Sequence, residues 1–307
     1  MINLHKQINK YKITYKNWIV VLVKVVLKME ANGVMRDGTI IKGRYLTIQM
    51  KDLVASGLEP KYNNENDEII FKYNRGKTSS DSLEKLPNNN YQFKNEDNLY
   101  VKIKGVSLNG DLNGIFVNKN YKFDFKGNDI IDVGMNIGDS SIYFCLTGAN
   151  KVIGIEPYPT VYNLAETNLN NNGLSNKVIT LNAGISSKCD SIKISESLVD
   201  SIDRLAVSSE DGIEIPIYTL DYIIEHYNLT NVFLKMDCEG CEYEAFKNIK
   251  DSNLFKIESI IIEYHHGYKD LKNFFSSKGY KTEIYETTKH KSPQGIQDIG
   301  YLKAWRD

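Results

Sequence analysis

Cysteine and proline are scarce in this chain of 307 residues, which contains four cysteines and six prolines. The cysteines do not have the dense, regular spacing of a secreted disulfide framework, and no cleavable signal peptide opens the chain. The scarcity therefore argues against a small secreted scaffold. We expect a reducing, cytoplasmic setting. The four residues are Cys145, Cys189, Cys238 and Cys241.

An excess of either charge is also missing. The chain has 38 basic and 39 acidic residues, which leave a formal net charge of -1. The molecule as a whole therefore has no general electrostatic attraction to nucleic acid. Apolar residues make up 41% of the chain and charged residues 25%, which is the usual balance of a globular protein.

No apolar run is long enough to cross a membrane. The best candidate, residues 18–29, falls short of the roughly 20 residues that a bilayer requires, and Lys24 interrupts it. Residues 1–29 nevertheless hold six lysines and no acidic residue, so peripheral contact of a basic helix with a membrane surface is an alternative. The favoured interpretation is a helix packed on the core with its lysines in solvent.

Residues 1–100 read as a helical and loop-rich accessory region. A helix is expected over residues 1–30, and Arg36 to Gly38 resemble a tight turn. Strand-like runs flank this turn and extend to residue 49. The stretch 61–97 is polar and is predicted to be mostly irregular.

Residues 101–307 are predicted to form a Rossmann-like domain. After two strand-like pieces, the second at 113–118, short apolar runs alternate with helical stretches, one of them at 242–249. This alternation predicts an α/β fold with a doubly wound, mostly parallel, seven-stranded sheet. Two successive strands at the C-terminus predict an antiparallel edge hairpin. The polar segment 287–298 between them is expected to be a loop, either mobile or covering a substrate.

The most informative segment is Asp132-Val-Gly-Met-Asn-Ile-Gly138, between an apolar strand and a helix. Gly134 and Gly138 suit a turn in which the backbone must adopt positive φ or approach a ligand closely. Glu156 follows the next strand, about 20 residues later, where a carboxylate can bind the ribose hydroxyls of an adenosine. The glycines form GxxxG and not the GxGxxG of dinucleotide sites, so a nicotinamide oxidoreductase is disfavoured.

Five segments together resemble the FkbM-type methyltransferases, which use S-adenosyl-L-methionine. They are IIDVGMNIGDSSIYF, VIGIEPYP, TLDYII, FLKMDCEGCEYEAF and IIIEYHH, and the resemblance covers about residues 128–307. It implies that Asp132, Gly134, Asn136 and Gly138 surround the methionine part of the cofactor, that Glu156 holds the ribose and that Asn182 lies near the adenine. It also implies methylation of a hydroxyl, often on a sugar or another small molecule. Cys238 and Cys241 depart from the small apolar residues that are usual there.

Candidate catalytic residues follow the next two strands. Asp237 and Glu239, followed by Glu242, come after the strand that ends in Lys235 and Met236, and His265 follows the last parallel strand. Transfer to a hydroxyl needs a group that takes the hydroxyl proton, and a carboxylate or a histidine with a pKa near neutrality can do so. The sequence does not decide which of them is the base. The alternative role for the carboxylates is capping of a helix that follows them.

Other chemistries have weaker support. A divalent metal is a possible second cofactor, but no dedicated ligand spacing requires one, so no metal ligands are predicted. The CxxC of Cys238 and Cys241 has no second pair at zinc spacing. The same fold could methylate nucleic acid or protein, but no arginine-rich patch supports nucleic acid as a partner. A binding protein that has lost catalysis is the remaining alternative.

Overall fold

The computed structural model describes residues 4–63, 65, 67–74, 98–105, 111–121, 123, 127–194, 212–292 and 295–306. The chain divides into two compact units. The first consists of residues 1–122 and 167–173, and the second of residues 123–166 and 174–307. The long helix α5 (Pro159–Asn171) therefore contributes to both units.

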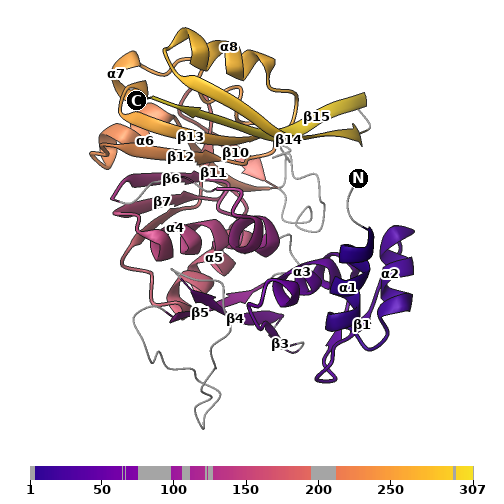
Figure 1. Cartoon of the computed structure of the whole chain (residues 1–307). Helices are drawn as coiled ribbons and strands as arrows, with labels where there is room; N and C mark the ends of the chain where they lie inside the picture. The colour runs from indigo at the N-terminus through magenta and orange to yellow at the C-terminus, as the bar shows by residue number, and fades with distance from the viewer. Residues whose placement is uncertain are drawn as a thin grey trace. The chain divides into compact units, whose positions relative to one another are not determined.

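A seven-stranded sheet forms the centre of the second unit (Figure 1). Its order is β14-β15-β13-β12-β6-β7-β8, and the five strands β6, β7, β8, β12 and β13 run parallel. The strands are β6 (Asp129–Val133), β7 (Lys151–Ile155), β8 (Val178–Leu181), β12 (Val232–Met236), β13 (Ile257–Tyr264), β14 (Lys281–Ser292) and β15 (Gly295–Trp305). The predicted doubly wound sheet with an antiparallel edge hairpin is confirmed.

Helices cover both faces of this sheet, which explains why its central strands read as continuous apolar runs. Every residue of β6 and β12 is buried. Helices α4 (Asp139–Thr147) and α5 lie on one face, and α6 (Leu220–His226), α7 (Asp251–Leu254) and α8 (Lys269–Ser277) lie on the other (Figure 1). A smaller sheet of β10 (Asp190–Ile194), β11 (Ile213–Tyr218) and β9 (Gly184–Ile185) completes the unit.

The segment 287–298, predicted to be a loop, is mostly strand. Thr288 to Ser292 of β14 pair with Gly295 to Ile299 of β15, after a register shift that follows Tyr285. Strand β13 pairs with β15 only from Ser259–Trp305 to Tyr264–Gly300. The hairpin therefore continues past the end of β13 as a two-stranded arm. Polar composition misled the prediction, because the backbone hydrogen bonds of an antiparallel pair can form between strands that contain few apolar residues.

The first unit combines three helices with two small sheets. The helices are α1 (Leu4–Thr14), α2 (Trp18–Val26) and α3 (Arg44–Ala55), and β1 (Gly33–Val34) pairs with β2 (Ile40–Ile41). The strand-like interpretation is wrong for residues 44–49, which begin α3. Leu46, Met50 and Leu53 are buried at a spacing of four and three residues, which is the period of a helix.

Two further expectations concern this unit, and the first is tested only in part. Within the stretch 61–97, β3 (Lys61–Asn63) pairs with β4 (Glu68–Asn74), and β4 pairs with β5 (Asn98–Lys104). The remainder, 75–97, lies outside the described residues. The run 113–118 is not a strand but a π-helical turn, η2 (Asn113–Asn118). The Asp111 carboxylate accepts a hydrogen bond from the Gly114 N–H at 2.8 Å and so supports the start of this turn.

Helix α2 departs from the packing expected of it. Val21 is its buried residue, whereas Ile19, Val20, Val23 and Val26 are each at least half exposed. The expectation of a helix packed on the core with only its lysines in solvent is therefore wrong for half of its apolar residues. None of the described helices combines the length and the apolar character that crossing a membrane demands.

Candidate active site

The candidate site lies at the carboxyl edge of the parallel sheet, where open α/β sheets bind their ligands. The loops after β6, β7, β12 and β13 meet at this edge because these strands are neighbours and run in the same direction. The loops after β6 and β7 carry the predicted cofactor residues. Those after β12 and β13 carry the predicted catalytic residues.

Gly134 brings the loop after β6 against the loop after β12. Its φ is +73°, and a Cβ added there would lie 1.8 Å from the carbonyl oxygen of Asp237. The Asp237 N–H in turn donates to the Val133 carbonyl at 3.1 Å. Gly138 also has positive φ and lies against Ala165 of α5. These glycines therefore permit close backbone packing, and at Gly134 this packing joins the two halves of the site.

Asp132 is fully buried and points into the protein. Its Oδ2 accepts hydrogen bonds from the hydroxyls of Ser140 at 2.6 Å and Ser141 at 2.7 Å, and its Oδ1 lies 3.1 Å from Lys235 Nζ. Lys235 Nζ also donates to the carbonyls of Val133 and Gly134. Burial lowers the pKa of Lys235, but the nearby carboxylates of Asp132 and Asp237 outweigh this effect and raise it. The Asp132 side chain thus holds the loop in position from inside.

Glu156, Asn136 and Asn182 form one connected group at the ends of β6, β7 and β8. Glu156 Oε2 accepts from the Asn136 N–H at 3.1 Å, and Oε1 accepts from the Tyr158 N–H at 3.1 Å. The Asn182 amide donates to the carbonyls of Glu156 and Pro157, both at 2.9 Å. Asn136 is held at φ +49°, a conformation that is uncommon outside glycine and that concentrates at functional sites.

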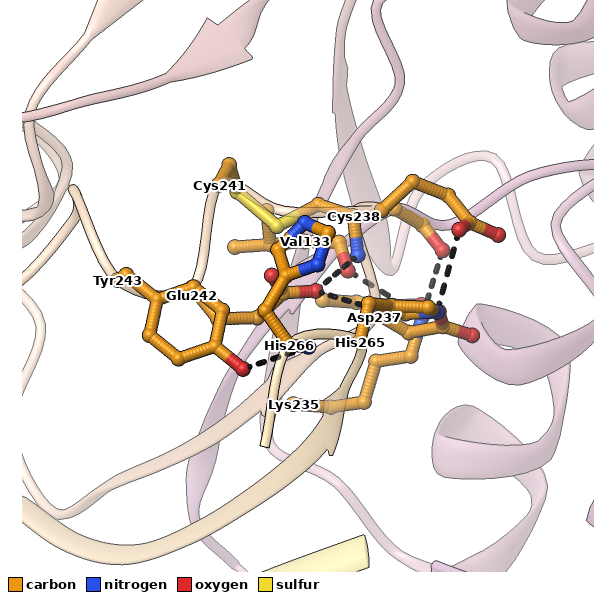
Figure 2. Close-up of polar contacts among 12 residues, drawn as sticks. Val133, Lys235, Asp237, Cys238, Cys241, Glu242, Tyr243, His265 and His266 are labelled. Atoms are coloured by element: carbon orange, nitrogen blue, oxygen red, sulfur yellow. Dashed lines mark hydrogen bonds and ion pairs between the residues drawn. A yellow bond between two sulfur atoms is a disulfide. The ribbon is translucent and has the colours of Figure 1, made fainter. Parts of the chain in front are cut away.

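The structure gathers Asp237, Glu239 and His265 beside this loop. Figure 2 shows Asp237 and His265 in this group. His265 Nε2 lies 3.2 Å from Glu239 Oε2 and 3.9 Å from Asp237 Oδ1. The carboxylates are about one-third exposed, at 29% for Asp237 and 33% for Glu239, so a ligand can reach them. Glu239 also has positive φ, at +55°. Three residues from two loops therefore converge on one accessible point.

Glu242 supports His265 from the opposite side of the ring. It is fully buried, and its Oε1 lies 3.1 Å from His265 Nδ1 and accepts the Cys238 N–H at the same distance. Burial lowers the pKa of His265, but the Glu242 hydrogen bond and the charges of Asp237 and Glu239 outweigh it and raise this pKa to about 10. The imidazole is therefore protonated at neutral pH, which differs from the near-neutral pKa expected from the sequence.

The helix predicted at 242–249 is absent. Residues 239–248 form consecutive turns instead, and α7 begins only at Asp251. The helix-capping alternative for Asp237 and Glu239 therefore has no helix to cap. A disulfide between Cys238 and Cys241 crosses the first of these turns (Figure 2). It was not expected from the sequence, because a lone CxxC without a secreted framework did not suggest a disulfide.

The sequence interpretation did not foresee three supporting side chains. Ser140 and Ser141 hold Asp132, and Glu242 holds His265. The serines at the start of a helix resembled ordinary helix-start residues, and Glu242 was one of several acids in its segment. Tyr243 adds a further link, because its hydroxyl donates to the Gly267 carbonyl at 2.7 Å and accepts the His266 N–H at 2.9 Å.

Comparison with known families identifies the domain that contains this site. Residues 132–282 match the model of the methyltransferase FkbM domain, so the match includes the cofactor loop, the carboxylates and His265. The chain contains an FkbM methyltransferase domain. Membership of this family implies S-adenosylmethionine as the methyl donor. None of the curated proteins matches the chain significantly.

Solved structures match part of this chain at low sequence identity. An FkbM methyltransferase from Methylobacillus flagellatus KT is 17% identical, with a TM-score of 0.42 over 62% of this chain. That match spans only 47% of the other chain, about half its length. TrmK from M. capricolum, solved with S-adenosyl-homocysteine, is 12% identical, with a TM-score of 0.36 over 62% of this chain and 67% of its own.

Proposed function

We propose that the protein transfers a methyl group from S-adenosylmethionine to a hydroxyl oxygen of a sugar, a glycan or another small-molecule acceptor. One observation supports this proposal most directly. The Gly134–Asp237 backbone contact places accessible carboxylates next to the expected cofactor loop. These carboxylates, which can bind the acceptor hydroxyl, therefore lie at the edge of the sheet where the methyl donor is expected to bind.

The residues at this edge fit the expected cofactor. Glu156 has a carboxylate oriented by two backbone N–H groups, which suits hydrogen bonds from ribose hydroxyls. The loop from Gly134 to Gly138 is the expected neighbour of the methionine part, and its two glycines let it pack closely against Asp237 and Ala165. Asn182, fixed to the carbonyls of Glu156 and Pro157, would lie beside the adenine. The bound sulfonium supplies an activated methyl group.

The acceptor side follows from the requirements of methyl transfer. The acceptor oxygen forms a bond to the methyl carbon as the sulfur–carbon bond breaks, and the hydroxyl proton must leave. Asp237 and Glu239 can orient that hydroxyl and one of them can take the proton. The protonated imidazole of His265, between Glu239 and Glu242, offsets their negative charge.

Three alternatives keep the fold but change the function. A nucleic-acid acceptor would bring phosphates toward the carboxylates of Asp237 and Glu239, which repel them. A protein acceptor and a catalytically inactive binding protein remain alternatives. Two measurements distinguish them from the proposal: binding of S-adenosylmethionine and transfer of its methyl group to candidate acceptors.

The first measurement is a calorimetric titration of the full chain with S-adenosylmethionine. We expect saturable binding that Glu156→Ala weakens at least tenfold, because the ribose loses its carboxylate partner. Glu166→Ala, which removes an exposed glutamate on α5, is the matched control and should leave the affinity unchanged. Transfer of a labelled methyl group to glycans and small alcohols is then screened before nucleic acids and proteins. Absence of binding by folded protein would refute the proposal.

A further inference from the structure

The arrangement of Asp237, Glu239 and His265 resembles a set of metal ligands. One oxygen of each carboxylate and one imidazole nitrogen all lie within 4.8 Å of one another. Ligand atoms at roughly 2.1 Å from a shared metal lie roughly 3 to 4.2 Å apart. The two distances from His265 Nε2, 3.2 Å to Glu239 and 3.9 Å to Asp237, fall within that range. Small side-chain movements would complete the set.

A second observation concerns the buried side of the histidine. Histidines that bind metals usually donate their other ring N–H to a carboxylate, which fixes the ring and its tautomer. Glu242 is placed to accept that bond from Nδ1 at 3.1 Å, which leaves Nε2 facing Asp237 and Glu239. Glu242 is fully buried, and its Oε2 has no hydrogen-bond partner among the described residues. A cation bound at Nε2, on the far side of the His265 imidazole, would help to offset the charge of the buried Glu242 carboxylate.

We propose that Asp237, Glu239 and His265 bind one divalent metal ion, which replaces the proton on His265 Nε2, with Glu242 as the residue that orients His265. Two carboxylate oxygens and one imidazole nitrogen suit Mn²⁺ and similar first-row ions. The partial exposure of Asp237 and Glu239 leaves room for further oxygen ligands.

The metal would act on the acceptor, so this role rests on the proposed function. An acceptor hydroxyl bound to the ion loses its proton more readily, because the metal stabilises the alkoxide. The oxygen is also held at the edge where the methyl group arrives. Asp237 and Glu239 then act as ligands, and the proton leaves to solvent or to a free carboxylate oxygen.

Titration of the chelator-treated full chain with Mn²⁺, followed by electron paramagnetic resonance, tests the site without the methyl donor. We expect one bound Mn²⁺ per chain. Glu239→Gln and His265→Gln should each weaken binding at least tenfold. Glu244→Gln, which changes an exposed glutamate paired with Lys247, is the matched control and should leave binding unchanged. Retained S-adenosylmethionine affinity in the same variants shows that they are folded.

The two proposals fail in different ways. Binding of S-adenosylmethionine without stoichiometric Mn²⁺, or Mn²⁺ binding that neither Glu239→Gln nor His265→Gln changes, would overturn the metal site alone. Mn²⁺ binding by a chain that does not bind S-adenosylmethionine would leave the metal site standing and overturn the proposed function.

A separate inference concerns the exposed face of α2. Ile19, Val23 and Val26 are spaced by four and three residues and lie on one side of the helix, at 59%, 50% and 69% exposure. Val20 and Leu27 extend this face, at 53% and 62%. A contiguous apolar surface of this kind on a short helix marks an interaction site.

Basic residues lie within and beside α2 in the sequence. Lys12, Lys16 and Lys28 are exposed, Lys24 is half-buried, and residues 1–29 contain no acid. Trp18 lies at the start of the helix with Lys12 Nζ 5.0 Å from its ring. Apolar residues flanked by lysines and an aromatic ring fit the boundary between lipid headgroups and acyl chains. We infer that this face lies on an anionic lipid surface.

Sedimentation with vesicles tests this inference on the full chain. We expect the protein to sediment with phosphatidylcholine–phosphatidylglycerol vesicles and not with phosphatidylcholine alone. Val23→Asp should abolish sedimentation, and Lys24→Glu should reduce binding by about fivefold. Ile213→Ser, at an exposed apolar residue of β11, is the control. Equal binding to both vesicles would overturn the inference. So would a dimer in light scattering that Val23→Asp dissociates while vesicle binding is absent.

Discussion

Lys235 and Asp132 carry opposite charges inside the second unit, with side-chain exposures of 2% and 0%. Each has additional hydrogen-bond partners, the Ser140 and Ser141 hydroxyls for Asp132 and two carbonyls for Lys235. Breaking such a pair leaves one buried charge without its counterion, which is more costly than removing both charges together.

We expect Lys235→Met to lower the free energy of unfolding by about 3–5 kcal/mol. The double variant Asp132→Asn with Lys235→Met should lose less than the sum of the two single variants, because it leaves no unpaired charge. Urea unfolding of the four proteins measures the coupling. Additive losses would show that the two residues do not stabilise each other.

The contacts of Asp132 also show what residue patterns alone convey. The sequence places Asp132 in the cofactor loop, but its carboxylate is turned inward, toward Ser140, Ser141 and Lys235. A motif gives the position of a residue along the chain and not the direction of its side chain. The effect of Asp132 on cofactor binding is therefore expected to pass through the position of the loop.

At the scale of elements, the loop between β6 and α4 depends on one glycine. A side chain at Gly134 would meet the Asp237 carbonyl, and the φ of +73° is unfavourable for any other residue. Gly173, at the end of α5, has a similar φ of +67° but has no atoms within 4 Å of the Cβ position. Substitutions at these two glycines can therefore distinguish the cost of backbone strain, which both share, from the cost of a steric clash, which only Gly134 has.

Gly173→Ala should cost about 1 kcal/mol of stability, from backbone strain alone. Gly134→Ala should cost roughly 3 kcal/mol, because the clash with Asp237 adds to the same strain. It should also weaken S-adenosylmethionine binding, whereas Gly173→Ala should not. Thermal unfolding and calorimetry measure the two effects. Equal losses in both variants would show that the contact between the loops is unimportant.

The disulfide between Cys238 and Cys241 closes a very short loop, so its entropic stabilisation should be small, about 2 kcal/mol. Replacing both cysteines with serine should lower stability by no more than this amount. The larger effect is expected on the acceptor side, because Asp237 and Glu239 flank Cys238. Methyl transfer should show a higher KM for the acceptor, with S-adenosylmethionine affinity unchanged. A weakened cofactor affinity would contradict this expectation.

The sequence predicted some elements and failed on others for physical reasons. The parallel strands were recognisable because burial on both faces produces short apolar runs. The beginning of α3 and the turn η2 were taken for strands because short apolar segments fit either type of structure. The clustering of Glu239 with His265 depends on two loops that are neighbours only in the folded sheet, so spacing along the chain could not give their distance.

At the scale of the whole molecule, part of α5 belongs to the first unit. The Asn172 amide accepts from the Lys102 N–H and donates to the Lys102 carbonyl, at 2.9 and 2.6 Å. Asn168 does the same for Lys104, at 2.8 and 3.0 Å. Two asparagine side chains thus serve β5 (Asn98–Lys104) as a neighbouring strand would.

We expect Asn168→Ala to destabilise the protein by about 1–3 kcal/mol for each buried group of Lys104 that loses its partner. The Lys104 amide should also exchange with solvent much faster. Asn170→Ala, at an exposed position of the same helix, is the control and should change neither property. Hydrogen exchange and urea unfolding measure the outcome. Unchanged exchange at Lys104 would contradict the role of Asn168.

The two-stranded arm of β14 and β15 continues past the end of β13, on the side where His265 lies, and the Gly267 N–H donates to the Asp298 carbonyl at 3.0 Å. Among the described residues, Thr288 to Ser292 form strand pairs only with Gly295 to Ile299, so insertions or deletions there leave the parallel strands in register. Under the proposed function, the arm would border the acceptor without touching the residues that bind the methyl donor. Sequence changes confined to this hairpin could therefore alter which alcohol is accepted, while the residues that carry out methyl transfer stay the same.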